Sequence, residues 1–471
     1  RNSTDFRKDA LTRVADCSFI QGDYKTAASS YGEVADNYYD PDDIYPYWQA
    51  AVAYGLDGKL KKKIERLREV KDANPESEHY APAMLDLGRS YVENKDAKSA
   101  SDCFDLVVEG VKDSSYVAQA LLEKAMMAKN AKRKEEALGY YKRVAENMTG
   151  TEYADNALLA IESIYQSEGR AKDYLAYIEN IGKGGFKTEE EKDDLYFASA
   201  EQLFLDRQYD KARVTLGEYL NAWPSGRSRD KAEYYIAECY RLSGDYERAR
   251  DAYEGVIDKG EGLFVEASML RYAELSYKLE HWQEAYLAYT SLYGKVSSAD
   301  TGKTALVGRM RSAYRARLYP EAENCAASVI VSEAPSVELL REAEYVRAKS
   351  LLSLSRRDAA YELFTKLAKN PTDRCGAEAE YLLIQDKFDR AEYKAVEDLV
   401  YAFSDSGTKQ NYWLARAFLV LGDAFAEQGD LRQAKATFES VRDGYSPVSD
   451  TDDVPDNVKM RLERLAEMGE K

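Results

Sequence analysis

The amino-acid sequence predicts an all-α solenoid, in which short helical hairpins stack on one another along the chain. Three observations indicate this fold. Apolar residues recur at helical spacing in short blocks, the blocks repeat about every 37 residues, and only 10 prolines occur in 471 residues. A hairpin of two amphipathic helices cannot bury its own apolar faces, so each hairpin needs a neighbour on both sides.

The segment from Arg229 to Gly260 shows the repeating block most clearly. Ala237 lies on the apolar face of a first helix, and Gly244 supplies the left-handed conformation in which a helix ends. Ala249 and Tyr253, four residues apart, share the apolar face of a second helix. The small alanines let the two helices approach closely, while the tyrosine is large enough to reach the next hairpin.

This pattern resembles the tetratricopeptide repeat (TPR). That family has six characteristic residues at fixed offsets along the repeat. In order, they are a small residue, an aromatic residue, a glycine, an aromatic residue, an alanine and an aromatic residue. Here the slots are filled by Ala237, Tyr240, Gly244, Tyr246, Ala249 and Tyr253. The resemblance implies a right-handed superhelix whose first helices line a concave groove.

The small residue of the first helix marks twelve repeats. The markers are Ala15, Ala51, Gly88, Ala125, Glu162, Ala200, Ala237, Ala273, Met310, Ala348, Leu383 and Gly422. The positions twelve residues further on are Ala27, Lys63, Ala100, Ala137, Tyr174, Ala212, Ala249, Ala285, Ala322, Ala360, Ala395 and Ala434. Average composition gives about one alanine in twelve, so this periodicity is not accidental. We therefore expect about 24 helices plus a C-terminal capping helix.

Four segments follow along the chain. Repeats 1–5 are expected in residues 1–181, a glycine-rich hinge in 182–190, repeats 6–12 in 191–447, and an acidic loop with the capping helix in 448–471. The hinge is expected because Gly182, Gly184 and Gly185 form the densest glycine cluster, and repeat 5 next to it carries Glu162 and Tyr174 in its small slots.

Composition excludes several kinds of partner. The net charge of −18 argues against nucleic acid as the main partner, and no apolar run is long enough to span a membrane. The chain begins at Arg1 without a Met or a leader-like apolar run, so we expect a fragment of a longer protein. Oligomeric state cannot be predicted from these features.

Neither catalysis nor cofactor or metal binding is expected. The 2 histidines lie in different repeats without ligand-like neighbours. The string Gly302-Lys303-Thr304 lacks the upstream glycine and strand of a phosphate-binding loop. The TPR family clamps a C-terminal carboxylate with Lys at the fifth repeat position and Asn at the ninth. Neither residue occurs at its position in any repeat of this sequence.

Binding residues are expected on the first helices. The fifth-position row is Thr12, Trp48, Leu85, Leu122, Leu159, Phe197, Tyr234, Leu270, Val307, Tyr345, Glu380 and Leu419. Part of this row must pack internally. The ninth and twelfth positions contribute aromatic and arginine side chains, which form interface hot spots. From these the sequence predicts a partner-binding patch of Phe204, Arg241, Tyr277, Arg311 and Tyr314, with internal packing as the alternative for such residues.

The predicted function is a non-enzymatic scaffold that binds a protein or peptide partner along the groove. The long period and the 38 tyrosines are similar to those of TPR lipoproteins of bacterial envelope assembly, which implies the periplasm or cell envelope; the cytoplasm is the alternative. The rival interpretation is a substrate-presenting arm of a larger protein whose catalytic or effector domain lies outside this fragment.

Overall fold

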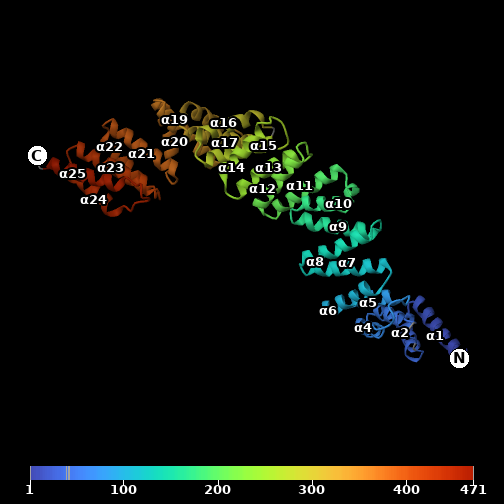
Figure 1. Ribbon diagram of the computed structural model, residues 1–471. Coiled ribbons are helices and arrows are strands. Elements are labelled where there is room, and N and C mark those ends of the chain that lie inside the picture. Colours follow the sequence, from blue (N-terminus) through green and yellow to red (C-terminus); the bar gives the residue numbers. More distant parts are fainter. Residues whose placement is uncertain (1, 39, 41–42, 297, 470–471) are drawn as a thin grey trace. The chain divides into compact units, whose positions relative to one another are not determined.

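The computed structural model describes residues 2–38, 40, 43–296 and 298–469, and these form 25 α-helices and one short 3-10 turn (Figure 1). The chain divides into two compact units, residues 1–229 and 230–471, which we call the N-terminal unit and the C-terminal unit. The division falls at the first residue of α13. Each unit contains six helical hairpins, which confirms the all-α hairpin array and the expected 24 helices plus a cap.

In the N-terminal unit, the first helices of repeats 1–6 are α1 (Asn2–Ile20), α3 (Tyr45–Leu56), α5 (Tyr80–Glu93), α7 (Ser114–Asn130), α9 (Glu152–Ser167) and α11 (Glu189–Leu205). The second helices are α2 (Tyr24–Asn37), α4 (Leu60–Arg68), α6 (Ala97–Gly110), α8 (Lys134–Asn147), α10 (Ala171–Asn180) and α12 (Tyr209–Ala222).

In the C-terminal unit, the first helices of repeats 7–12 are α13 (Arg229–Leu242), α15 (Val265–Lys278), α17 (Ala299–Arg315), α19 (Val337–Ser353), α21 (Arg374–Asp389) and α23 (Asn411–Glu427). The second helices are α14 (Tyr246–Ile257), α16 (Trp282–Lys295), α18 (Tyr319–Ile330), α20 (Arg357–Ala368), α22 (Tyr393–Asp405) and α24 (Leu431–Gly444), and α25 (Val454–Gly469) follows.

The turn inside each hairpin has the same backbone geometry. One residue per repeat has a positive φ: Gly22, Gly58, Lys95, Lys132, Gly169, Arg207, Gly244, Glu280, Arg317, Ser355, Ala391 and Gly429. In eleven repeats this residue lies seven positions after the marker predicted from the sequence. Asp245 and Asp430 follow such glycines and accept a hydrogen bond from the third backbone N–H of the next helix, which caps it.

Repeat 11 corrects the predicted register by one residue. Its positive-φ residue is Ala391, so the marker is Ile384 and not Leu383. The second-helix position is then Val396 instead of Ala395, and both Ile384 and Val396 are fully buried. The same shift places Tyr381 rather than Glu380 in the fifth-position row. The physical reason is that the left-handed turn residue fixes where the second helix starts.

Among the described residues, the core consists of several apolar clusters, each shared by neighbouring repeats. Separate clusters of buried residues centre on Tyr31, Phe104, Tyr253, Tyr289 and Phe364 in different hairpins. The packed helix pairs are adjacent or next-adjacent in chain order. This is the nearest-neighbour architecture of a solenoid. The right-handed superhelix that the resemblance implies stays a prediction.

The glycine-rich segment after α10 contains the 3-10 turn Gly184–Phe186. Directly after it, the Lys187 ammonium lies 3.0 Å from a carboxylate oxygen of Glu162, with both side chains largely buried. The glutamate in the small slot of repeat 5 therefore contacts the segment that follows the same repeat. The domain boundaries predicted from the sequence, including a hinge at 182–190, stay predictions.

The helix α25 packs against repeats 11 and 12, as expected for the predicted capping helix. Val454, Val458 and Leu465 of α25 pack into the apolar cluster of repeats 11 and 12, and Arg461 pairs with Asp423 of α23 at 2.8 Å. The exposed residues of α25 include charged side chains together with Met460 and Met468. Among the described residues, no helix is both long and apolar enough to cross a lipid bilayer.

Candidate functional site

The five predicted binding residues belong to two units. Phe204 lies on α11 of the N-terminal unit, where its ring packs edge-on against Tyr209 with centroids 5.8 Å apart. Arg241 on α13, Tyr277 on α15 and both Arg311 and Tyr314 on α17 belong to the C-terminal unit. The C-terminal unit therefore carries the part of the patch that can be described together.

Arg241 takes part in a buried ion-pair network. Its guanidinium donates two hydrogen bonds to Glu238, of 2.5 and 3.1 Å to one carboxylate oxygen. The hydroxyls of Tyr234 and Tyr253 also donate to this carboxylate. Burial raises the pKa of Glu238, but the hydrogen bonds from Arg241 and Tyr253 outweigh it, so the pKa lies below its ordinary value. Arg241 thus stabilises a buried charge that would be costly if left unpaired.

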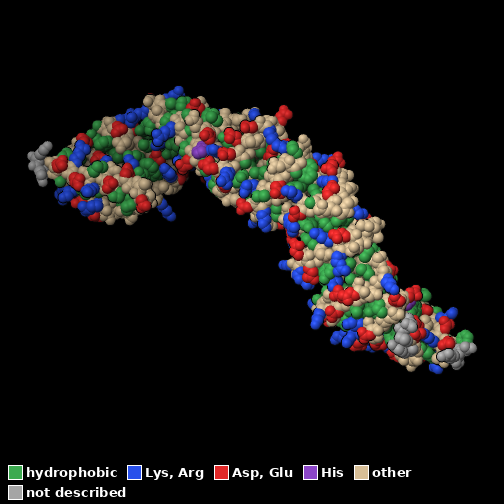
Figure 2. Space-filling view, in the orientation of Figure 1, with side chains coloured by type: hydrophobic (Ala, Val, Ile, Leu, Met, Phe, Trp, Pro, Cys, Tyr) green, Lys and Arg blue, Asp and Glu red, His purple; other side chains and the backbone are tan. Residues whose placement is uncertain are grey.

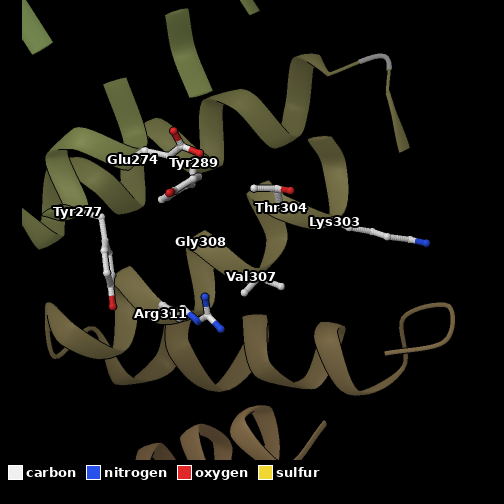
Figure 3. Close-up of a pocket in the computed structure, with 8 residues that line it drawn as sticks. All are labelled: Glu274, Tyr277, Tyr289, Lys303, Thr304, Val307, Gly308 and Arg311. Carbon is white, nitrogen blue, oxygen red and sulfur yellow. The ribbon is translucent and has the colours of Figure 1, made fainter. Parts of the chain in front are cut away.

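Tyr277 and Arg311 line a cavity of about 430 Å³ between α15, α16 and α17, which we call the first cavity. Its lining residues are Glu274, Tyr277, Tyr289, Lys303, Thr304, Val307, Gly308 and Arg311. Figure 3 shows the Tyr289 ring beside the α17 backbone at Gly308, while Lys303 extends away from the other labelled side chains. A Cβ atom at residue 308 would lie 2.5 Å from this ring, so glycine is needed for the close approach. Tyr277, Tyr289 and Val307 thus form the apolar part of the cavity wall, and the other side chains that line it are polar or charged.

A second cavity of about 340 Å³ adjoins the first and shares Tyr277 and Arg311 with it. Its lining residues are Tyr277, Arg311, Tyr314, Arg315, Glu342, Tyr345, Val346, Arg374 and Cys375. These side chains come from α15, α17, α19 and α21, which are the first helices of four consecutive repeats. We call the two adjoining cavities together, which share Tyr277 and Arg311, the α15–α21 groove.

Some charged side chains that line the second cavity form ion pairs, and others do not. Arg311 donates two parallel hydrogen bonds to Glu342, at 2.7 and 2.6 Å, and this pair forms one wall. Arg315 lies over the Trp282 ring, 5.7 Å from its centroid, and Trp282 in turn packs edge-on against Tyr277 at 4.8 Å. Arg315 and Arg374 are both exposed and form no ion pair with the residues that the structure describes.

Tyr345, on the floor of the second cavity, is hydrogen-bonded to a buried carboxylate. The Tyr345 hydroxyl donates to the buried Glu378 carboxylate at 2.8 Å, and Lys349 donates to the same carboxylate at 2.7 Å. Burial and the neighbouring Glu378 charge raise the pKa of Tyr345, so this tyrosine stays a neutral donor. Burial also raises the pKa of the Cys375 thiol to about 11, which keeps it protonated at neutral pH.

The match to known protein families decides what kind of hairpin this is. A tetratricopeptide repeat model matches residues 231–259 and 416–446, which are repeats 7 and 12. This chain carries tetratricopeptide repeats. No curated protein matches the sequence.

The TPR chain also resembles several solved structures. A tetratricopeptide repeat protein from Parabacteroides merdae is 14% identical with a TM-score of 0.32, and the match covers 57% of this chain and 98% of that chain. Yeast Tom70 is 13% identical with a TM-score of 0.29, covering 99% and 97%. A chain of the APC/C hetero-tetramer Cut9-Hcn1 is 14% identical with a TM-score of 0.30, covering 98% of this chain and 90% of that chain.

The TPR spacing brought together three of the five predicted residues. Tyr277, Arg311 and Tyr314 all line the α15–α21 groove, and Val307 of the fifth-position row lines it as well. Arg374 and Cys375 were missed because they lie in the first turn of α21, outside the repeat positions considered. Tyr289 was missed because it lies on a second helix. A search for arginines at the starts of first helices would have found Arg374.

Proposed function

We propose that the chain is a non-enzymatic scaffold, whose C-terminal unit holds an extended segment of a protein partner in the α15–α21 groove. The observation that carries this proposal is a pair of cavities that share Tyr277 and Arg311 and are lined by four consecutive first helices. Their volumes of about 430 and 340 Å³ lie within the range of ligand sites, roughly 300–1,000 Å³. A groove that runs across successive repeats fits an extended chain better than it fits a compact small molecule.

The lining chemistry supports a protein segment as the ligand. Tyr277, Tyr314 and Tyr345 present apolar rings together with polar hydroxyls, and aromatic and arginine residues are enriched in protein interfaces. The internal hydrogen bonds of Tyr345 and Arg311 hold their side chains before binding, which lowers the entropy lost on association. The protonated Cys375 thiol is a poor nucleophile, in keeping with a binding role for the groove.

The test is selection from a displayed library of random 12-residue peptides on the immobilised chain. We expect enriched peptides that bind the wild type and lose at least tenfold in affinity with the double variant Tyr277→Ala, Val307→Glu. These changes remove the wall that both cavities share and place a charge on the apolar wall of the first cavity. Circular dichroism spectra and melting curves establish that the variant is folded.

Leu287→Ala is the matched control, because Leu287 is exposed on α16 and lines neither cavity. It should bind the selected peptides as the wild type does. Peptides that bind the double variant equally well, or a selection that yields no enriched peptide, would refute the groove as the binding site.

A role in bacterial envelope assembly is a further part of the proposal, and it is supported by the long repeat period and the tyrosine content. Fractionation of the source cells tests it, with antibody detection of the chain. Recovery in the periplasmic or membrane fraction agrees with this role, and recovery in the cytosol contradicts it. The interpretation as an arm of a larger enzyme predicts a catalytic domain in the full-length gene product.

A further inference from the structure

We propose that the second cavity binds a carboxylate side chain, so that the partner segment is acidic and also places an apolar side chain in the first cavity. This inference rests on the proposed function and specifies its ligand. Its starting point is the pairing of the arginines that line the second cavity. Arg311 forms an ion pair with Glu342, but Arg315 and Arg374 form no ion pair with described residues.

Local charge opposes the charge of the whole chain. The second cavity is lined by three arginines and one glutamate, whereas the chain carries a net charge of −18. Figure 2 shows acidic and basic side chains mixed over the visible face. Because charges farther apart than about 8 Å are largely screened at physiological salt, a bound group senses the nearby guanidinium groups most strongly. The groove therefore attracts a negative group even though the chain as a whole is acidic.

The aromatic surroundings favour guanidinium groups as binding groups. Arg315 lies over the Trp282 ring, which lies against Tyr277 at the shared wall of the two cavities. A ring on one side limits the motion of the guanidinium and leaves its N–H groups for a ligand. Tyr314, Tyr345 and Val346 on the floor reduce the local water, which strengthens a charge-assisted hydrogen bond to a carboxylate.

The first cavity supplies the second half of the specificity. Tyr289 is buried, Val307 is half-buried, and both line this cavity beside Gly308. Glu274 accepts a hydrogen bond from Arg271 at 2.8 Å, which offsets part of its charge. An apolar side chain buried here gains from the removal of its surface from water. The predicted ligand motif therefore combines an aliphatic or aromatic residue with a nearby Asp or Glu.

The same random-peptide selection, repeated with charge variants, tests the motif. Peptides selected on the wild type should be enriched in Asp or Glu next to an apolar residue. Their affinity, measured by fluorescence anisotropy with the selected peptide carrying a dye, should fall at least tenfold for Arg315→Glu, Arg374→Glu. Replacing the peptide's acidic residue by its amide should weaken binding to the wild type similarly, and should have little effect on the charge variant.

Arg432→Glu, Lys369→Glu is the matched control, since it makes the same change in net charge at exposed positions that do not line the groove. It should bind as the wild type does. A loss of affinity equal to that of the groove variant would overturn the local site. Because the control shares the change in net charge, this comparison separates local recognition from long-range attraction.

The outcomes separate this inference from the proposed function. Enriched peptides without acidic residues, which still require Tyr277 and Val307, would leave the scaffold in place and overturn the carboxylate site. No enrichment on the wild type would overturn both. A phosphoserine peptide that binds more than tenfold tighter than its glutamate counterpart would show that phosphate, and not carboxylate, is the preferred anion, and would overturn the assignment.

Discussion

Gly244, at φ +85°, shows how single residues set the geometry of every hairpin. A Cβ atom at this position would meet no atom within 4 Å, so only the backbone conformation disfavours another residue. An L-residue in the left-handed region costs about 1–2 kcal/mol. Seven of the twelve turns nevertheless carry a non-glycine residue there, such as Glu280 at φ +64°. Packing of the flanking helices must offset this strain.

Gly244→Ala should therefore destabilise repeat 7 by about 1 kcal/mol. Gly255→Ala is the matched control, because Gly255 lies exposed within α14 with open space around its would-be Cβ. It should instead stabilise the helix by about 0.5–1 kcal/mol, since alanine is the better helix former. Hydrogen exchange of the α14 amides measures both changes. Equal effects of the same sign would show that the turn conformation does not limit stability.

Glu380 predicts a pH dependence of stability. This carboxyl is partly buried on α21 without an ion pair among the described residues, and burial raises its pKa from 4.5 to about 7. The folded chain therefore binds this proton more tightly than the unfolded chain does. The protonated carboxyl makes its full contribution to the free energy of unfolding below pH 4.5. This contribution is lost as the pH rises through 7.

Glu380→Gln should remove that loss. We expect the variant to exceed the wild type in free energy of unfolding by about 1–2 kcal/mol at pH 8, with a much smaller difference at pH 5.5. Glu362→Gln, at an exposed position on α20, should show no such pH-dependent gain. Thermal melts at the two pH values check this. A gain that is the same at both values would contradict the burial argument.

Repeat 11 shows what sequence spacing resolves and what it does not. Alanine at 395 agreed with the alanine of nine other repeats, so the pattern selected it, yet the structure buries Val396 in that slot. The turn residue that decides the register is Ala391, which has no sequence signature for a positive φ. Where a turn carries glycine, as at Gly22 and Gly429, the predicted register is correct. A periodic pattern thus locates the hairpins more reliably than it aligns each residue.

At the scale of the element, a small residue determines how closely paired helices approach. A Cβ at Gly422 of α23 would lie 2.3 Å from the Phe438 ring of α24, and Gly88 has the same relation to Phe104 at 2.4 Å. The rings are buried between the two helices and have little room to move. In repeats with alanine at this slot, the helices must leave space for the methyl group.

Gly422→Ala should thus force α23 and α24 apart and destabilise repeat 12 by about 1–3 kcal/mol, as overpacking does. Adding Phe438→Leu should recover part of the loss, because the smaller side chain makes room for the methyl group. Urea unfolding of the single and double variants tests this coupling. Strictly additive effects of the two substitutions would contradict a direct clash.

The α15–α21 groove is also a property of elements and not of repeat positions alone. The spacing rule found Tyr277, Arg311 and Tyr314, since ninth and twelfth positions of successive first helices lie close together. It could not find Arg374, because the length of the loop before α21 decides where that helix begins. Nor could the spacing rule show that Arg241 donates hydrogen bonds to the buried Glu238 of its own helix. Side-chain pairing depends on contacts that a periodic pattern does not encode.

At the scale of the whole molecule, stability is local because the packed helix pairs are near neighbours in the chain. The sum of repeat energies and nearest-neighbour interfaces describes such arrays, and a defect in one repeat weakens mainly the repeats beside it. Phe104 on α6 and Phe364 on α20 are fully buried in different clusters, and they lie in different units. Truncating either ring to alanine removes about 3–5 kcal/mol of local stability.

Native-state hydrogen exchange measured by mass spectrometry should separate the two variants. Phe104→Ala should speed amide exchange in α3 to α8 and leave α19 to α22 at the wild-type rate, whereas Phe364→Ala should do the reverse. Each variant is thus the control for the other, because the chemical change is identical and only its place in the array differs. Faster exchange along the entire chain in both variants would mean that the array opens as one cooperative body, and that local packing does not set its stability.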